Sequence, residues 1–226
     1  AQKLIEKYRQ SVLKAAVTGE LTKDWREDKL EPADKLLERI LKKRREKWRG
    51  KGKYKEPVQP DTSDLPELPE GWCWVSVEQI SSSVDYGTSA KCTTENVGVA
   101  VLRMGNIQDG YLDVEKLKYL PGDHNEFPRL LLNTGDLLFN RTNSAELVGK
   151  TAVYKDVPKK ASYASYLIRV KTINVEPDFV SAFINSAYGK SWIRSVVSQQ
   201  VGQANVNGTK LKALACLLYT SPSPRD

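Results

Sequence analysis

Apolar residues recur at steps of three and four in two stretches near the N-terminus, which is the spacing of amphipathic α-helices. The first stretch runs from Leu4 to Ala16, and Gly19 behind it suits the end of a helix. The second begins at Pro32, because proline fits the first helical position, and it continues to Trp48. No capping residue precedes Leu4, so we expect the first helix to be the end of a longer one.

Short apolar runs follow position 70 and predict β-strands. The predicted strands cover residues 73–77, 99–102, 111–114, 136–139, 151–154 and 165–170. Residues 81–94 are polar and loop-like, residues 177–197 have helical spacing, and residues 199–207 are polar without core character. The pattern predicts an α+β chain, with a long amphipathic helical arm followed by a mixed, β-rich domain.

Changes of composition divide the chain into four predicted parts. Residues 1–19 hold the end of the long helix, and residues 20–64 hold the second helix and a linker rich in Pro, Gly and charge. Residues 65–214 form the β-rich domain. Residues 215–226 are an atypical tail, which from Leu217 resembles translated sequencing-adaptor sequence more than protein. We expect this tail to be non-native and to have no structural role.

Positive charge is concentrated near the N-terminus. The 226 residues carry a net charge of +7, but residues 1–56 contain 18 Lys and Arg against 10 Asp and Glu, while the remainder contains 17 against 18. This asymmetry favours an anionic partner near the helical arm, and the alternative is a solvated helix face.

The sequence shows neither membrane nor disulfide features. Its longest apolar run, Ala213–Leu218, is too short to span a bilayer, and no signal peptide is visible. The three cysteines, Cys73, Cys92 and Cys216, are odd in number and form no CxxC pair, so we interpret them as reduced thiols. These observations predict a cytoplasmic protein that does not contact a membrane.

Signatures of catalysis are mostly missing. His124 is the single histidine, which excludes a histidine-based metal cluster, and the sequence has no GxSxG elbow and no Walker-type phosphate loop. Asp136 follows Gly135 before an apolar run, where a turn carboxylate is more common than a catalytic acid. A hydrolase that uses Asp136 is the weakest alternative, and the prediction is a non-catalytic binding protein.

Polar side chains follow two of the predicted strands. Arg103 and Asn106 come after the strand at 99–102, and Arg141 and Asn143 come after the strand at 136–139. Arginine and asparagine side chains match the edges of guanine and adenine, so these positions are candidates for reading DNA bases. The alternative is that the asparagines form turns and the arginines are solvated. For Arg141, a further alternative is an ion pair with Asp136 or Glu146.

Eight short segments between positions 4 and 207 share their order and spacing with one protein family. They are LIEKYRQSVLKAAVTGEL at 4–21, LLERI at 36–40, LPEGWCW at 68–74, YGTS at 86–89, LRMGNI at 102–107, GDLLFNR at 135–141, LVGK at 147–150 and QANVN at 203–207. Together they resemble the specificity subunit of type I restriction–modification systems.

The resemblance implies a DNA-recognition subunit without catalysis of its own. Such a subunit has two target recognition domains, separated by two long helices that pair as an antiparallel coiled coil, and each domain reads half of a bipartite site in double-stranded DNA. It recruits methyltransferase subunits and restriction–translocation subunits, which hold S-adenosylmethionine and ATP, so no cofactor is expected in this chain. By this resemblance the chain is a fragment, in which residues 1–19 end the conserved helix and residues 65–214 form one target recognition domain.

Within that domain the predicted DNA contacts are polar residues at loop positions. Base-edge candidates are Thr88, Ser89, Arg103, Asn106, Arg141, Asn143, Gln203 and Asn205, and phosphate candidates are Lys91 and Lys150. The alternative function is a protein-interaction scaffold whose basic helical arm binds an acidic partner, without readout of DNA.

Overall fold

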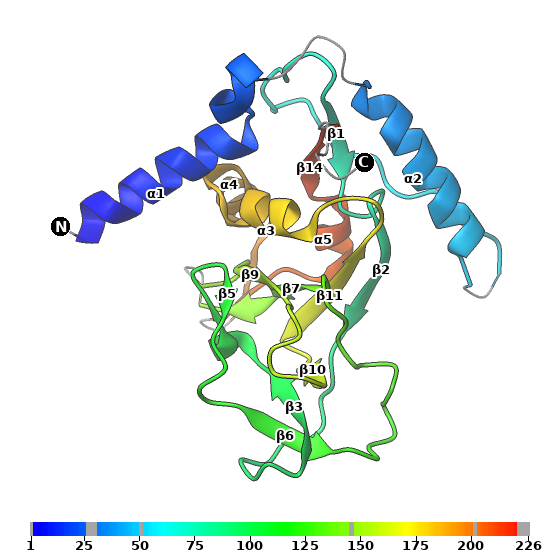
Figure 1. Cartoon of the computed structure of the whole chain (residues 1–226), viewed down its shortest axis with the longest axis vertical. Coiled ribbons are helices and arrows are strands. Elements are labelled where there is room, and N and C mark those ends of the chain that lie inside the picture. The colour runs from blue at the N-terminus through cyan, green and yellow to red at the C-terminus, as the bar shows by residue number, and fades with distance from the viewer. Residues whose placement is uncertain (1, 26–30, 50–51, 145–146, 201–202, 221–226) are drawn as a thin grey trace.

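The computed structural model describes residues 2–25, 31–49, 52–144, 147–200 and 203–220, and it shows two helical arms above a domain of sheets and short helices (Figure 1). The helices are α1 (Gln2–Val17), α2 (Ala33–Lys47), α3 (Pro177–Asn185), α4 (Ala187–Val196) and α5 (Gly208–Ala213), and the 3₁₀ turns are η1 (Glu20–Trp25) and η2 (Met104–Asn106). The strands are β1 (Cys73–Ser76), β2 (Ser81–Tyr86), β3 (Gly98–Leu102), β4 (Ile107–Gln108), β5 (Tyr111–Leu112), β6 (Lys118–Pro121), β7 (Leu137–Asn140), β8 (Thr142–Asn143), β9 (Thr151–Val153), β10 (Ala161–Tyr163), β11 (Leu167–Thr172), β12 (Ser198–Gln200), β13 (Gln203–Asn205) and β14 (Ala215–Leu218). The predicted mixture of helices and sheets is confirmed.

The central sheet has the strand order β2-β11-β7-β9, and all its pairs are antiparallel. Successive side chains of β7 point to opposite faces, and both faces are covered. Leu137 and Phe139 join the core shared with α3 and α4, whereas Leu138 joins a second core with Tyr154 and Tyr163. Burial on both faces explains why β7 is a continuous apolar run in the sequence.

A smaller sheet, ordered β10-β3-β6, forms the end of the domain opposite the helical arms (Figure 1). Strand β10 is parallel to β3 and pairs Tyr163 with Leu102. A parallel bridge from Thr88 to Ala164 continues this pairing. These contacts bring the chain after β2, after β3 and after β10 to one region of the domain.

The prediction that residues 81–94 form a loop is wrong for residues 81–86. They form β2, the edge strand of the central sheet, which pairs with β11 through its backbone. An edge strand pairs on one side only and faces solvent on the other, so it tolerates polar serine side chains. Ser82 Oγ donates to the Lys171 carbonyl at 3.2 Å. The polar composition of residues 81–86 therefore led to the prediction of a loop where the structure has a strand.

The predicted helix at 177–197 is two helices separated at Ser186. This residue has an extended backbone, and both its N–H and its Oγ donate to the Phe183 carbonyl, at 3.1 and 2.6 Å. The turn brings α4 close to α3. A Cβ at Gly189 would lie 2.2 Å from the Ile184 carbonyl oxygen, so the sharp turn depends on glycine there.

The expectation that residues 215–226 have no structural role is wrong for residues 215–219. Strand β14 is buried along its length and pairs antiparallel with β1, from Cys73 opposite Leu218 to Ser76 opposite Ala215. The ring of Tyr219 stacks on Trp72, with centroids 4.6 Å apart. The apolar run is a core strand, while residues 221–226 lie outside the described residues.

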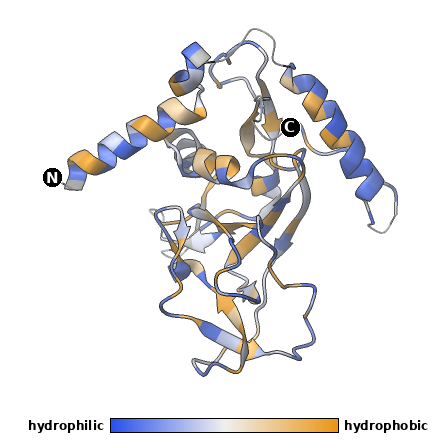
Figure 2. Cartoon of the chain, in the orientation of Figure 1, coloured by the Kyte–Doolittle hydropathy of each residue, from blue (hydrophilic) through white to orange (hydrophobic). Residues whose placement is uncertain are grey.

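Helix α1 presents apolar side chains on two opposite sides. Val17 is buried and Leu13 is partly buried in the core beside α3 and α4. The other side is exposed and carries the stripe Leu4, Ile5, Tyr8 and Val12. Figure 2 shows orange, hydrophobic bands along α1. Gly19, with φ of +74°, ends the helix, as predicted. Helices α1 and α2 diverge on opposite sides of the domain, so they do not pair with each other, and a long coiled coil stays a prediction (Figure 1).

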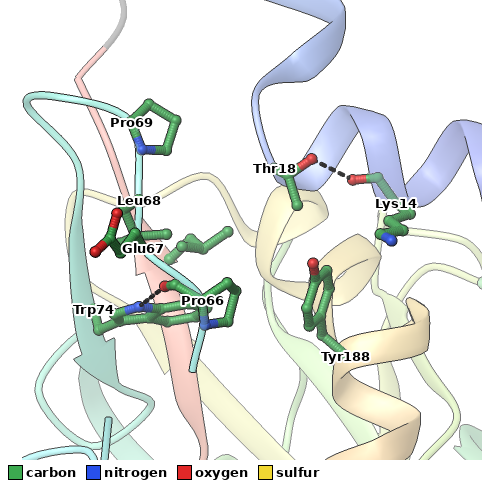
Figure 3. Close-up of a pocket in the computed structure, with 9 residues that line it drawn as sticks. Lys14, Thr18, Pro66, Glu67, Leu68, Pro69, Trp74 and Tyr188 are labelled. Carbon is green, nitrogen blue, oxygen red and sulfur yellow. Dashed lines mark hydrogen bonds between the residues drawn. The ribbon is translucent and has the colours of Figure 1, made fainter. Parts of the chain in front are cut away.

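The joint between α1 and the domain contains a pocket of about 200 Å³. Lys14 of α1, Thr18 just after α1 and Tyr188 of α4 lie on one side of it, and Trp74 and the segment from Pro66 to Pro69 lie on the other (Figure 3). Trp74 Nε1 donates to the Pro66 carbonyl at 3.2 Å, which ties this segment to β1. None of the predicted DNA contacts lines this pocket. Within the described ranges, no helix combines the length and hydrophobicity needed to cross a membrane.

We predict that Leu217→Ala lowers the free energy of unfolding by about 2–5 kcal/mol, because Leu217 is fully buried in the main core. Urea denaturation measures this. The matched control is Leu21→Ala, at a side chain that is 61% exposed, for which we expect a change within about 0.5 kcal/mol. Equal, small effects of both substitutions would contradict a structural role for β14.

Candidate nucleic-acid interface

Arg141 is held where three segments meet. It directly follows β7, and its backbone N–H donates to the Tyr166 carbonyl at 3.0 Å. Its own carbonyl accepts from the N–H of Val206 at 2.9 Å. Because β7 is fully buried, these bonds fix the base of a long side chain against a rigid element. Such support is what a side chain needs to present a fixed hydrogen-bonding geometry.

The guanidinium of Arg141 lies over the ring of Tyr86, 5.1 Å from its centroid. Its Nη1 donates to the Ser165 carbonyl and its Nη2 to Asn205 Oδ1, both at the long distance of 3.4 Å. Its Nε is buried and has no hydrogen-bond partner within the described residues. The guanidinium thus contacts the ring, while its hydrogen-bonding capacity is weakly used.

The alternative of an ion pair between Arg141 and Asp136 is excluded in this structure. Asp136 is buried, accepts from the N–H of Asn133 at 3.0 Å, and lies 3.7 Å from Arg169 Nη1. The second suggested partner, Glu146, lies outside the described residues. Among the residues that are described, Arg141 forms no ion pair with a carboxylate.

Asn205 reaches Arg141 through a small sheet. Strands β12, β13 and β8 pair antiparallel, and Asn205 lies opposite Thr142, the residue after Arg141. Ala204 and Val206 on either side of Asn205 are buried, so the expectation that residues 199–207 lack core character is wrong at these positions. Asn143 and Gln203 belong to the same sheet, but their side chains lie outside the described part of the structure.

Asn106 has an internal role, which argues against the predicted contact with a base edge. It is 3% exposed, and its Oδ1 accepts from the N–H of Arg103 at 2.9 Å. Its Nδ2 donates to the carbonyls of Asp113 and Lys116, at 2.8 and 3.3 Å. This amide closes the turn η2 and joins it to the chain after β5. Its donors and acceptor are used inside the protein.

Thr88 also has an internal role, contrary to its prediction as a base contact. It is 2% exposed, its Oγ1 donates to the Glu126 carboxylate, and the same oxygen accepts from the N–H of Ala90 at 3.0 Å. Its neighbour Ser89 and the phosphate candidate Lys91 are exposed. The structure therefore leaves these two side chains free for solvent or a ligand, and leaves Thr88 buried beneath them.

The remaining candidates, Arg103 and Lys150, border a surface groove of about 410 Å³. Arg103 Nη2 donates to the Lys116 carbonyl at 3.1 Å, and Lys150 Nζ donates to Gln108 Oε1 at 3.4 Å. We name this the Met104 groove, and its lining residues are Arg103, Met104, Gly105, Ile107, Gln108, Leu147, Lys150 and Tyr166. The backbone bond from Arg141 to Tyr166 places the groove beside Arg141.

Two aromatic residues of this surface were missed by the sequence reasoning. Tyr86 is 43% exposed beneath Arg141, and Tyr166 is 48% exposed between Arg141 and the Met104 groove. The hydroxyl of Tyr86 accepts from the N–H of Gly208 at 2.7 Å, which fixes the ring. A signal existed, because an exposed aromatic beside a polar strand end is typical of binding surfaces.

An ion cluster centred on the buried Arg169 lies behind the surface. Arg169 is 3% exposed, and its Nη2 lies 3.0 Å from Asp85 Oδ2, while its Nη1 lies 3.7 Å from Asp136 Oδ2. Burial raises the pKa of Asp136, and the Asn133 N–H and the charges of Lys171 and Arg169 act in the opposite direction. With its carboxylate 6% exposed, Asp136 has no access to a substrate, which argues against a hydrolase built on this residue. No cluster of His, Cys, Asp and Glu suited to a metal ion occurs among the described residues.

Comparison with known proteins finds relatives in one class, although no protein-family model matches the sequence. The type I restriction enzyme EcoKI specificity subunit of Escherichia coli K12 is 25% identical over 218 residues, which cover 95% of this chain and 39% of the relative. The EcoEI specificity subunit of Escherichia coli is 26% identical over 219 residues, which cover 92% and 36%. The chain thus spans less than two fifths of the length of these relatives.

A solved structure from work on complex assembly and conformational transition of the type I R-M system has the same fold. It aligns with a TM-score of 0.52 and 15% identity, covering 96% of this chain and 45% of that one. The short sequence segments predict a resemblance to part of a type I specificity subunit. The EcoKI and EcoEI specificity subunits confirm this resemblance.

We predict that Asn106→Ala lowers the free energy of unfolding by about 1–3 kcal/mol, because it leaves one buried donor and two carbonyls without their partner. Thermal and urea unfolding measure this. Ser89→Ala, at an exposed side chain, is the control and should leave stability within about 0.5 kcal/mol of wild type. Unchanged stability of Asn106→Ala, together with altered base preference, would restore the original prediction.

Proposed function

We propose that this chain, as a fragment of the specificity subunit of a type I restriction enzyme, reads one half of a bipartite target in double-stranded DNA. The observation that carries the proposal is Arg141, a planar cation that lies over the ring of Tyr86 and is anchored on a buried strand, without a carboxylate partner among the described residues. The names of the relatives support the assignment.

The chemistry of Arg141 suits a guanine. A guanidinium can donate two hydrogen bonds to O6 and N7 of guanine, and this contact discriminates against other bases by about 1–3 kcal/mol. In the free chain the same donors make two 3.4 Å contacts, to the Ser165 carbonyl and Asn205 Oδ1, which a base can replace at little cost. Once Arg141 turns to a guanine, Asn205 is free for an adjacent base.

The chain itself supplies no catalysis in this proposal. Methylation and cleavage belong to methyltransferase subunits and restriction–translocation subunits, which bind S-adenosylmethionine and ATP, and the assembly works in the cytoplasm. The similarity in fold to a chain from a type I R-M assembly supports a place in such a complex. The role of residues 1–19 and 20–64 is to join the recognition domain to these partners.

The exposed stripe of α1 supports a second helix as the partner of the arm. Leu4 is 73% exposed and Tyr8 is 70% exposed, although the opposite side of α1 already packs on the domain. A helix with two apolar sides fits between a domain and another helix. In a whole subunit, that helix is the one that fixes the distance between the two halves of the DNA target.

A scaffold that binds an acidic partner through its basic arm is the alternative, and the structure favours it less. On α2, Arg44 lies 3.6 Å from Glu78, and Arg45 is paired with Glu56. Part of the positive charge of the arm is therefore neutralised inside the chain. No described carboxylate pairs with Arg141, and this favours recognition by the domain.

We expect Arg141→Ala to relax the preference for one base pair of the half-site by about 1–3 kcal/mol, leaving the other positions unchanged. Arg141→Lys should relax it as well, because lysine keeps the charge but lacks the planar pair of donors. The measurement is methylation of targets with single-base changes by a complex reconstituted from the full-length subunit and its methyltransferase subunits.

Lys91→Ala is the control for this experiment, because the loss of a contact to phosphate weakens binding to all sequences about equally. A uniform loss with Arg141→Ala that Arg141→Lys repairs would show that Arg141 contacts phosphate. Unchanged preference with both variants, in folded protein, would refute base reading by this residue.

A further inference from the structure

The Met104 groove combines exposed apolar side chains with cations. Met104 is 36% exposed, Leu147 39% and Tyr166 48%, and Arg103 and Lys150 complete the rim. Among the described residues, no carboxylate lines the groove. A surface that binds a neutral protein segment does not need a rim of cations. A nucleic acid suits both features of the groove, because its phosphates pair with cations and its bases carry apolar groups.

The groove has a fixed shape. Ile107 is buried and forms its floor. The amide of Gln108 is oriented by two contacts, since its Nε2 donates to the Gly105 carbonyl at 3.0 Å and its Oε1 accepts from Lys150 at 3.4 Å. Arg103 is tied by its Nη2 to the Lys116 carbonyl. These bonds hold polar groups at the edge and leave the apolar atoms of Met104 and Leu147 uncovered.

The groove continues the surface around Arg141. The carbonyl of Tyr166 accepts from the backbone N–H of Arg141, and the carbonyl of Ser165 accepts from its Nη1. Tyr166 therefore belongs to both sites, with Arg141 on one side and the groove on the other. A DNA base pair next to the one that Arg141 contacts would lie over this groove.

We propose that the Met104 groove binds the C5 methyl group of a thymine in the half-site, with Arg103 and Lys150 directed at phosphates beside it. The inference rests on the proposed function, and it names a ligand for one part of that surface. Thymine is the base with a methyl group in the major groove, and proteins read it by apolar contact. The uncovered side chains of Met104, Leu147 and Tyr166 provide that contact.

Replacement of thymine by deoxyuridine tests this directly, because it removes the methyl group and keeps every base-pairing group. The full-length subunit, in complex with its methyltransferase subunits, is first used to select its half-site from random DNA. Each thymine of the selected site, on either strand, is then replaced in turn. We expect one replacement to weaken binding about fourfold, the effect of burying one methyl group.

Two variants connect this effect to the groove. In Met104→Ala and in Leu147→Ala, the ratio of the binding affinities for thymine and deoxyuridine at that position should fall from about four toward one. Tyr111→Ala removes an exposed aromatic side chain, 76% exposed and outside the groove, and should keep the fourfold difference. Circular dichroism of each variant confirms folding, and the scan on the wild-type complex stands even if one variant fails to fold.

Several results would overturn the inference while the proposed function stands. They are a selected half-site without thymine, a wild-type complex that binds all deoxyuridine sites as tightly as the thymine site, and a thymine preference that survives in both groove variants. Selection of no sequence at all would instead refute the proposed function, so the two failures are distinguishable.

Discussion

The neighbourhood of Arg141 and Tyr86 depends on a buried arginine in the strand between them. Arg169 lies on β11, opposite Asp85 on β2 and Leu138 on β7. A cation in the interior must be paired, and Arg169 meets Asp85 and Asp136 and donates to the Leu131 carbonyl at 2.9 Å. These partners lie on both sides of β11, so they fix the register of β2 and β7 against it.

That register decides which side chains meet at the surface. Tyr86 lies opposite Ile168 and Asn140 lies opposite Leu167, so β2 and β7 end beside the start of β11. Arg141, the next residue, then reaches the ring of Tyr86. A shift by one residue would turn every side chain of a strand to the other face of the sheet and separate the pair. The position of Arg141 against Tyr86 is thus set in part by buried charges, those of Arg169 and Asp136.

Much of the fold was predictable where burial shapes the sequence. The strands at 99–102 and 136–139 are apolar because both their faces are covered, and the structure confirms them as β3 and β7. Strand β2 was missed because an edge strand tolerates serine, and β14 was missed because its resemblance to adaptor sequence outweighed its apolar run. The break at Ser186 was missed because both halves keep helical spacing.

The candidate site was predictable in part, because residue type does not reveal where a side chain's hydrogen bonds go. Arg141 and Asn205, two of the predicted base contacts, are brought together in the structure. Asn106 and Thr88 are also polar, but a short polar side chain beside a turn bonds most easily to nearby groups of its own chain. Asn106 bonds to the backbone of Arg103, and Thr88 bonds to the carboxylate of Glu126. Tyr86 was not considered as a contact because its role depends on the register of β2.

The central claim is that this domain reads base sequence. The most direct measurement is selection from a DNA pool randomised over one half-site, by the methyltransferase complex of the full-length subunit, followed by sequencing of the bound fraction. We predict enrichment of one defined half-site that contains a guanine, and loss of that guanine preference with Arg141→Ala. Binding that depends on salt but enriches no sequence would contradict the account.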